Sequence, residues 1–230
     1  MLKEPLVSVI MPVFNNEKYV AEALESVFNQ TYKNIEIICV SDGSTDNSLK
    51  ILESVGDKIV LIKNAKNEGI AAGRNKAIKV AHGDFLALMD GDDIWKETKI
   101  EKQMKQFIDD PDLDISFCFI KCFLSPEMPD EVKKVRHCPT DPIPGYVSAA
   151  SVIKKSFFNK VGYFDTKWKV GEFIDWYTKA KDLGCKDNIV EEVLYLRRIH
   201  ETNTGVTERP SRTDYLKILK NSLDRKRNGK

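Results

Sequence analysis

The strongest constraint on the fold is a regular alternation of short apolar runs and helical patterns in the first hundred residues or so. Runs with the length and composition of buried strands occupy residues 6–11, 35–40, 58–62 and 85–89. Apolar residues at helical spacing follow them at 19–28, 49–55, 69–81 and 99–108. Repeated strand–helix–strand units predict a mostly parallel central sheet flanked by helices on both faces. We therefore expect an α/β fold.

Polar clusters follow three of these predicted strands, at residues 12–16, 41–46 and 90–93. Ligands of open α/β sheets bind beyond the carboxyl ends of the strands, so the three clusters would build one site along one edge. Asp, Gly and Ser are also ordinary turn residues. That alternative accounts for any one cluster but poorly for all three, and we therefore predict a ligand site there.

The third cluster holds three carboxylates within four residues, on Asp90, Asp92 and Asp93. Such carboxylates repel one another unless a cation or hydrogen-bond donors compensate. Hard oxygen ligands suit Mg²⁺ or Mn²⁺, which keep positions open for water or substrate phosphates. A diphosphate leaving group would supply those phosphates. Asp42, a lone carboxylate after the second strand, suits a nucleobase or a ribose better.

Charge and motif content argue against several classes of function. The chain has 36 Lys plus Arg against 35 Asp plus Glu, and this balance does not favour nucleic-acid binding by bulk electrostatics. It lacks a Gly-x-Gly-x-x-Gly after the first strand and a Gly-Lys-Ser/Thr loop, which argues against dinucleotide enzymes and P-loop NTPases. No apolar run approaches the roughly 18 residues that span a bilayer, and the first residues lack the apolar stretch of a signal peptide. Five cysteines without a Cys-x-x-Cys indicate free thiols in a reducing compartment.

The strand–helix alternation weakens after residue 110. Five prolines between 125 and 145 predict a long irregular segment. Helices are expected at 154–160 and 171–183, and a late strand at 193–196. Ser211 is expected to cap a last helix, which ends in a basic tail. The apolar stripe of that helix is Tyr215, Leu216, Ile218, Leu219 and Leu223.

Six segments, taken in order, resemble the family 2 glycosyltransferases, which have the GT-A (Rossmann-like) fold. They are Val7–Asn15, Ser26–Thr31, Val40–Asp46, Asn67–Asn75, the Asp-x-Asp motif at Asp90–Asp93, and Val161–Asp165. Each segment is weak alone, but their order and spacing together are highly specific. The resemblance covers residues 6 to about 205.

The resemblance implies an inverting, metal-dependent transferase that moves a hexosyl or N-acetylhexosaminyl group from a nucleotide-diphosphate sugar, commonly a UDP-sugar, with Mn²⁺ or Mg²⁺ as cofactor. The nucleotide-binding residues that it implies are Pro12, Val13, Phe14, Asn15, Asp42, Arg74, Asp90 and Asp92. Asp42 would bind the base, and Asp92 with Asp93 would bind the metal. Arg197, Arg198 and His200 resemble a late segment that closes over the diphosphate, although solvated charges in a surface turn are the plain alternative. Trp176 lies beside the expected acceptor site, where its ring could stack on a sugar or simply pack in the core.

One departure from the family concerns the general base, which takes the acceptor proton during inversion. The family usually supplies it from a Glu-Asp pair that opens a helix, and Phe173 stands where the Asp is expected. Glu172 and Asp175 are three residues apart on one helical face, and either is a candidate. We favour Asp175, because Glu172 occupies the position of the family's other carboxylate. The alternative is that both only stabilise the positive helix N-terminus.

We expect one fused domain in three parts: a nucleotide-sugar and metal half (1–110), an acceptor half (111–205), and a C-terminal helix with a basic tail (206–230). The acceptor would be a glycan, a lipid-linked sugar or another hydroxyl compound in cell-surface polysaccharide biosynthesis. The expected location is the cytoplasm, with contact between the basic helix and the inner face of the membrane as one option. The rival hypothesis is a non-catalytic nucleotide-sugar-binding or assembly module, which Phe173 makes credible.

Overall fold

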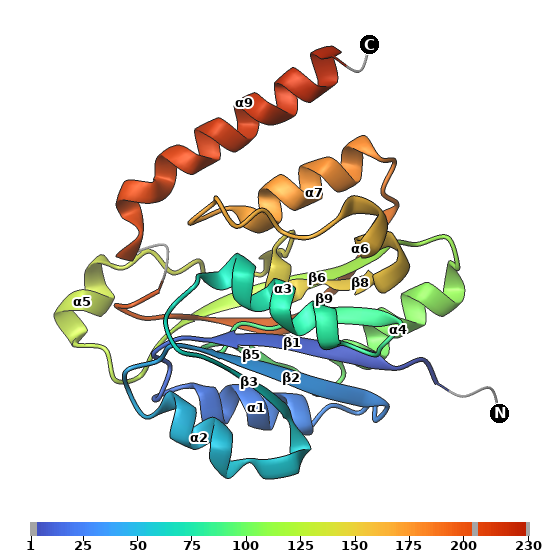
Figure 1. The fold of residues 1–230 in the computed structure, drawn as a ribbon. Coiled ribbons are helices and arrows are strands. Elements are labelled where there is room, and N and C mark those ends of the chain that lie inside the picture. Colours follow the sequence, from blue (N-terminus) through green and yellow to red (C-terminus); the bar gives the residue numbers. More distant parts are fainter. Residues whose placement is uncertain (1–3, 204–206, 229–230) are drawn as a thin grey trace.

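The computed structural model describes residues 4–203 and 207–228 (Figure 1). Its strands are β1 (Val7–Val13), β2 (Ile35–Asp42), β3 (Val60–Asn64), β4 (Phe85–Leu88), β5 (Ile94–Trp95), β6 (Ile115–Leu124), β7 (Ile143–Pro144), β8 (Val152–Lys154) and β9 (Asp187–Ile199). Across the described residues they form one nine-stranded sheet in the order β3-β2-β1-β4-β8-β6-β9-β5, with β7 paired to β6.

Helices cover both faces of this sheet (Figure 1). They are α1 (Val20–Phe28), α2 (Ser48–Ser54), α3 (Ile70–Val80), α4 (Lys99–Asp109), α5 (Asp130–Val135), α6 (Lys155–Val161), α7 (Glu172–Asp182) and α9 (Thr213–Asn228), with short 3-10 turns η1 (Gly56–Lys58), η2 (Ser148–Ala150) and η3 (Arg209–Arg212). Helices α1, α2 and α4 contribute to one buried apolar cluster, and α3, α6 and α7 to the other. Helix α9 lies outside α7.

The first four strands pair in parallel, as the strand–helix alternation predicts. β1 lies at the centre of this part of the sheet and is buried on both faces. Val9 and Met11 point into one apolar cluster and Ile10 into the other, which explains why the strand reads as an unbroken apolar run. The second half of the sheet is mixed, because β8 pairs antiparallel with both β4 and β6. The expected α/β class, with a mostly parallel central sheet, is confirmed.

Three local predictions from the sequence need correction. The late strand extends over Asp187–Ile199 and pairs in parallel with β6 along its length, which short-range periodicity did not indicate. The proline-rich segment contains α5 and β7. Ser211 does not cap the last helix, because it lies within η3 and its hydroxyl donates to Glu208 at 2.9 Å. Among the described helices, none is long and apolar enough to cross a membrane.

Candidate active site

The carboxyl ends of β1, β2 and β4 meet at one edge of the sheet, as their parallel pairing requires. The loops after β1 and β2 are bonded to each other. The side-chain oxygen of Asn15 accepts the Thr45 N–H, and the Asn16 N–H donates to the Ser48 hydroxyl, both at 2.8 Å. Gly91, after β4, lies so near that a Cβ there would stand 2.9 Å from the Asn16 amide. The structure therefore brings the three polar clusters together.

The end of β1 and the loop after it present only part of their predicted nucleotide-binding set to the outside. Val13 is buried in the core, and Pro12 packs beneath α3, where its Cβ is 3.3 Å from the position of a Cβ on Gly73. Phe14 is 43% exposed, and Asn15 follows it with a positive φ of 52°. The outward side chains here are thus those of Phe14 and Asn15.

Asp42 ends β2 and is buried. One carboxylate oxygen accepts the Asn64 amide at 2.6 Å and the Glu68 N–H at 3.0 Å, and the other accepts the Gly69 N–H at 2.9 Å. Gly69 directly precedes α3 and has a φ of +91°, a backbone conformation that favours glycine. Asp42 therefore fixes the start of α3. A nucleobase bound here would donate to a carboxylate that already accepts hydrogen bonds from the protein.

Arg74, on α3, connects the two sides of the candidate site. Its guanidinium is only 1% exposed. It donates to Asp90 at 2.7 Å and to the Ser148 hydroxyl at 3.0 Å through one nitrogen, and to Glu172 at 2.5 Å through another. One buried cation thus joins a carboxylate after β4 to a carboxylate that opens α7. Sequence reasoning missed Ser148, which lies just beyond the proline-rich segment and carries no motif signal.

Asp92 faces the end of β9. Its carboxylate lies 2.9 Å from His200 Nε2 and accepts the Asn203 amide at 3.3 Å. The His200 ring is buried and packs 4.6 Å, centroid to centroid, from the ring of Tyr19. The Asp92 side chain keeps 20% of its surface exposed. The late histidine that the sequence singled out is therefore in contact with the acidic motif.

Asp93 points the other way, into the protein. Its oxygens accept the Tyr195 hydroxyl and, at 2.6 Å, the Arg198 N–H. Burial raises the pKa of Asp93 well above its usual range, and the neighbouring carboxylates of Asp92 and Asp90 raise it further. Both oxygens hold β9 against the motif. The prediction of Asp93 as a metal ligand is therefore wrong in this geometry.

Arg197 and Arg198 have different surroundings. Arg198 is buried, with its guanidinium 4.9 Å from the Tyr19 ring centroid and 4.7 Å from that of Phe123, and it donates to Glu22 at 2.5 Å. A guanidinium held in this way stabilises the fold and is not open to a diphosphate, which corrects the prediction for Arg198. Arg197 is exposed and stays a candidate for phosphate contact.

Two aromatic residues of α7 belong to the core. Phe173 is buried and its ring stacks on Tyr177 at 6.0 Å. Trp176 is 1% exposed, stacks on Phe158 at 5.1 Å and donates its indole N–H to the Gly162 carbonyl at 2.7 Å. The idea that Trp176 stacks on an acceptor sugar is therefore wrong, and core packing is its role. Phe173 shares that core.

The two candidate bases on α7 face different partners. Asp175 is 2% exposed, lies 2.6 Å from Lys179 Nζ, and is 4.0 Å from a guanidinium nitrogen of Arg225 on α9. Glu172 is also buried but meets Arg74, in the network that reaches the acidic motif. Glu172 is therefore the α7 carboxylate on the site side, and Asp175 is the one on the α9 side.

The acidic motif offers a partial ligand set for a divalent cation. Asp90 and Asp92 keep 30% and 20% of their side-chain surface exposed, so their oxygens are within reach of a bound ligand. Burial raises the pKa of Asp90, an effect that Arg74 offsets in part and that Asp92 reinforces. Among the described residues, no three His, Cys, Asp or Glu side chains gather as a complete metal site. Two open carboxylates nonetheless suit an ion that takes its other ligands from water and substrate phosphates.

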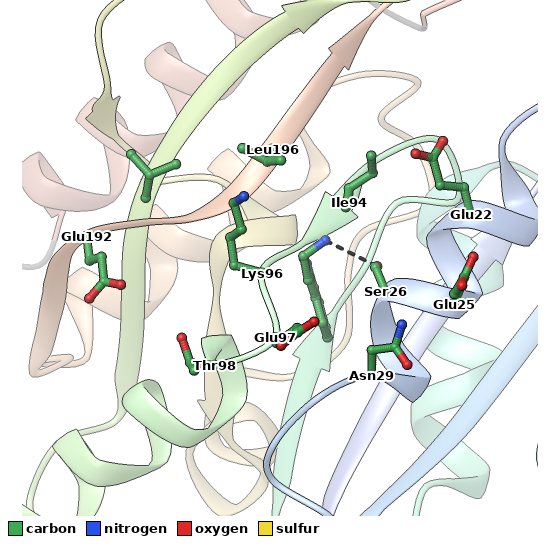
Figure 2. A pocket seen from close by; sticks show the side chains of 12 residues that line it. Glu22, Glu25, Ser26, Asn29, Ile94, Lys96, Glu97, Thr98, Glu192 and Leu196 are labelled. Atoms are coloured by element: carbon green, nitrogen blue, oxygen red, sulfur yellow. Dashed lines mark hydrogen bonds between the residues drawn. The ribbon is translucent and has the colours of Figure 1, made fainter.

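A separate hollow of about 610 Å³ lies between α1, β5 and β9 (Figure 2). Its lining consists of Glu22, Glu25, Ser26, Asn29, Ile94, Trp95, Lys96, Glu97, Thr98, Glu192, Val193 and Leu196. On its wall the Ser26 hydroxyl accepts the Trp95 N–H at 3.2 Å. None of the site residues predicted from the sequence lines this hollow, so it is not part of the candidate site.

The mostly parallel sheet flanked by helices is a fold of the GT-A type. Residues 8–162 match the family described as glycosyl transferase family 2. An uncharacterized glycosyltransferase of Methanocaldococcus jannaschii is 30% identical over 95% of this chain and 76% of its own length. The chain therefore belongs to glycosyltransferase family 2.

Two further proteins, one a relative in sequence and one a solved structure, are similar to this chain. An Escherichia coli UDP-Glc:alpha-D-GlcNAc-diphosphoundecaprenol beta-1,3-glucosyltransferase is 40% identical over 50% of this chain and 44% of its own length. The crystal structure of Staphylococcus aureus TarS 1-349 superimposes with a TM-score of 0.66 at 25% identity, over 84% of this chain and 60% of that one. Several curated relatives, the E. coli enzyme among them, match this chain over less than half of their own length.

Proposed function

We propose that this glycosyltransferase moves a sugar from a UDP-sugar to a hydroxyl acceptor with inversion at the anomeric carbon. The observation that carries the proposal is the meeting of the clusters after β1, β2 and β4, with the open carboxylates of Asp90 and Asp92 beside them. Support for UDP comes from the E. coli relative, whose name specifies UDP-Glc, and from TarS, which has been solved with UDP and with UDP-GlcNAc. The transferred group would be a hexosyl or N-acetylhexosaminyl group.

In this proposal residues 1–110 hold the donor and residues 111–205 shape the acceptor side. Phe14 and Asn15 provide the outward surface for the nucleotide, and Asp42 adds an acceptor for the base. Asp90 and Asp92 would hold Mn²⁺ or Mg²⁺. When bound, that ion would offset the negative charge on the diphosphate leaving group. His200 fixes the orientation of Asp92, because its ring nitrogen contacts that carboxylate.

The acceptor hydroxyl must lose a proton as it attacks the sugar, and Glu172 is the carboxylate that we assign to this step. It belongs to the Arg74 network that reaches Asp90, whereas Asp175 faces Lys179 and α9. The geometry therefore favours Glu172 over Asp175, the opposite of the preference drawn from the sequence. Arg74 would hold Glu172 in place before the acceptor binds.

The acceptor that we propose is a lipid-linked sugar or another growing cell-surface glycan. The E. coli relative is named for a GlcNAc-diphosphoundecaprenol acceptor, which is a lipid carrying a sugar. All five cysteines are free thiols, as expected in a reducing compartment. We accordingly place the reaction in the cytoplasm, at the inner face of a membrane.

Transfer assays with the Glu172→Gln and Asp175→Asn variants test the assignment of the base. Each substitution keeps the size of the side chain, so UDP-sugar binding should survive in both. We expect Glu172→Gln to lower turnover at least about a hundredfold and Asp175→Asn to change it less than about fivefold. The reverse order would move the base to Asp175. Absence of turnover in the wild-type protein with every donor and acceptor, together with intact UDP-sugar binding, would favour the non-catalytic binding module.

A further inference from the structure

Helix α9 packs against α7 through one of its sides, and it forms the outer layer of the molecule there (Figure 1). Ile218 is buried in this contact, and the Asp214 carboxylate accepts the Lys169 N–H at 3.2 Å. Near the other end of α9, Arg225 donates to Asp182 at 2.8 Å. The inner face of α9 is therefore fixed along most of its length.

The start of α9 is seated beside the candidate acceptor site. A Cβ on Gly171 would stand 2.9 Å from side-chain atoms of both Tyr215 and Ile218. Gly171 immediately precedes Glu172, the α7 carboxylate that meets Arg74. The inner side of α9 thus packs directly beside the glycine that precedes Glu172.

The outer face of α9 carries a row of exposed leucines. Leu216, Leu219 and Leu223 are 70%, 57% and 47% exposed. Their spacing of three and then four residues places them on one side of the helix, away from Ile218. The apolar stripe predicted from the sequence is thus divided, with Ile218 in the α7 contact and the three leucines facing outward.

Basic side chains flank this row. Lys220 and Arg227 each lie four residues after a leucine of the row, and Lys226 lies three residues after Leu223. All three are exposed, and within the described chain they have no ion pair. Of the two acidic residues of α9, Asp214 is buried and paired with Lys217, and Asp224 is partly exposed, so the three basic side chains exceed the one acidic side chain that remains.

We propose that this outer face, made of Leu216, Leu219, Leu223, Lys220, Lys226 and Arg227, docks on an anionic lipid bilayer. The inference rests on the proposed function in one respect, since a lipid-linked acceptor gives the docking its purpose. Leucines flanked by lysine and arginine are the composition of helices that lie in a membrane interface. The same positive charge disfavours a second copy of this face, because like charges would meet. Charge complementarity therefore selects an anionic lipid surface.

Sedimentation with vesicles tests this surface directly. We expect the wild-type protein to bind vesicles of phosphatidylglycerol and phosphatidylcholine and to bind pure phosphatidylcholine poorly. Lys220→Gln/Lys226→Gln/Arg227→Gln should weaken binding to anionic vesicles about a hundredfold, from a factor of about five per charge. Leu216→Ser/Leu219→Ser/Leu223→Ser should abolish binding by removing the apolar contact. High salt should weaken the wild-type interaction.

A matched control is the variant Lys33→Gln/Lys50→Gln/Lys58→Gln, which removes three exposed lysines from the α1–β2 loop, α2 and η1. Figure 1 shows α1 and α2 on the face of the sheet opposite α9. It should bind vesicles like the wild type. Equal binding by the control and the α9 charge variant, or no binding of the wild type to anionic vesicles, would overturn the proposal. The proposal would also be overturned if light scattering showed a wild-type dimer that does not bind vesicles and that the leucine substitutions convert to a monomer.

Transfer to a water-soluble acceptor separates this proposal from the proposed function. The α9 variants should retain that turnover, because none of the changed side chains touches the site, and should lose transfer to an acceptor embedded in vesicles. Vesicle binding without any turnover would support the membrane-docking surface and overturn the proposed enzymatic function. Turnover without vesicle binding would support the enzymatic function and overturn the membrane-docking surface.

Discussion

Replacing Arg74 by methionine tests whether one buried cation holds the donor and acceptor sides of the site together. Methionine fills most of the same volume but leaves the carboxylates of Asp90 and Glu172 without their shared partner. The guanidinium is 1% exposed, so water cannot replace it inside the folded protein. The substitution should therefore reduce the free energy of unfolding and not only the turnover.

The size of this effect follows from the contacts. Arg74 makes two charge-assisted hydrogen bonds, of 2.5 and 2.7 Å, and removing one partner of a buried ion pair costs about 3–5 kcal/mol. The Asp90 side chain is 30% exposed, which lets water recover part of one bond, so we expect about 3 kcal/mol. In a chain of this size such a loss lowers the Tm by about 6–12 °C.

The pH dependence gives the reasoning a sharper test. Burial already raises the pKa of Asp90, and loss of the neighbouring Arg74 cation should raise it further in the folded state. The folded variant then binds more protons than the unfolded chain, so its stability falls as pH rises from the ordinary carboxyl range toward that raised value. Urea unfolding should show a smaller penalty at pH 5 than at pH 8. A penalty below about 1 kcal/mol, or one independent of pH, would refute this role.

Three other substitutions give separate readouts. Asp92→Asn should lower metal-dependent turnover at least about a hundredfold, measured as UDP release with Mn²⁺, and unchanged turnover would exclude Asp92 from the metal site. Gly171→Ala should cost about 2–4 kcal/mol in urea unfolding, because its φ of +81° disfavours a side chain and a Cβ would crowd α9. Gly184→Ala, with a φ of +82° and open space around a Cβ, should cost only about 1–2 kcal/mol, and equal costs would contradict the contact. Burial lowers the pKa of Lys99 to about 8, so the folded protein releases this proton at a lower pH than the unfolded chain does. The stability of the wild type relative to Lys99→Met should therefore rise by about 3 kcal/mol between pH 8 and 10.5. A stability difference that does not change over this range would contradict the lowered pKa.

The sequence predicted the first half of the fold well because local patterns determine it. The four parallel strands and their helices each carry their own periodicity, and parallel pairing follows from the short strand–helix connections. The gathering of the polar clusters follows in turn, since carboxyl ends of parallel strands share an edge. The long β9 was less visible, because its pairing with β6 is a contact between segments about 70 residues apart.

The orientation of individual site residues was beyond what the sequence could predict. Glu172 and Asp175 share a helical face on paper, yet one meets Arg74 and the other meets Arg225. The difference comes from α9, which packs beside Asp175 but lies far from it in the sequence. No local sequence pattern around Asp175 therefore indicated this contact. Trp176 gave the same difficulty, since an aromatic residue beside a site reads the same whether it faces a sugar or the core.

Polar residues at the sheet edge divide into those that build the site and those that remain open to a ligand. Asp93 and Arg198 have their polar atoms occupied by the protein, whereas Asp92 keeps exposed surface. Substituting Asp93 or Arg198 should therefore reduce stability first and activity as a consequence, because a buried partner is left unsatisfied. Substituting Asp92 should reduce activity with a smaller loss of stability. Comparing Tm with turnover across these three positions would separate the residues that act on the donor from those that only hold its binding edge in place.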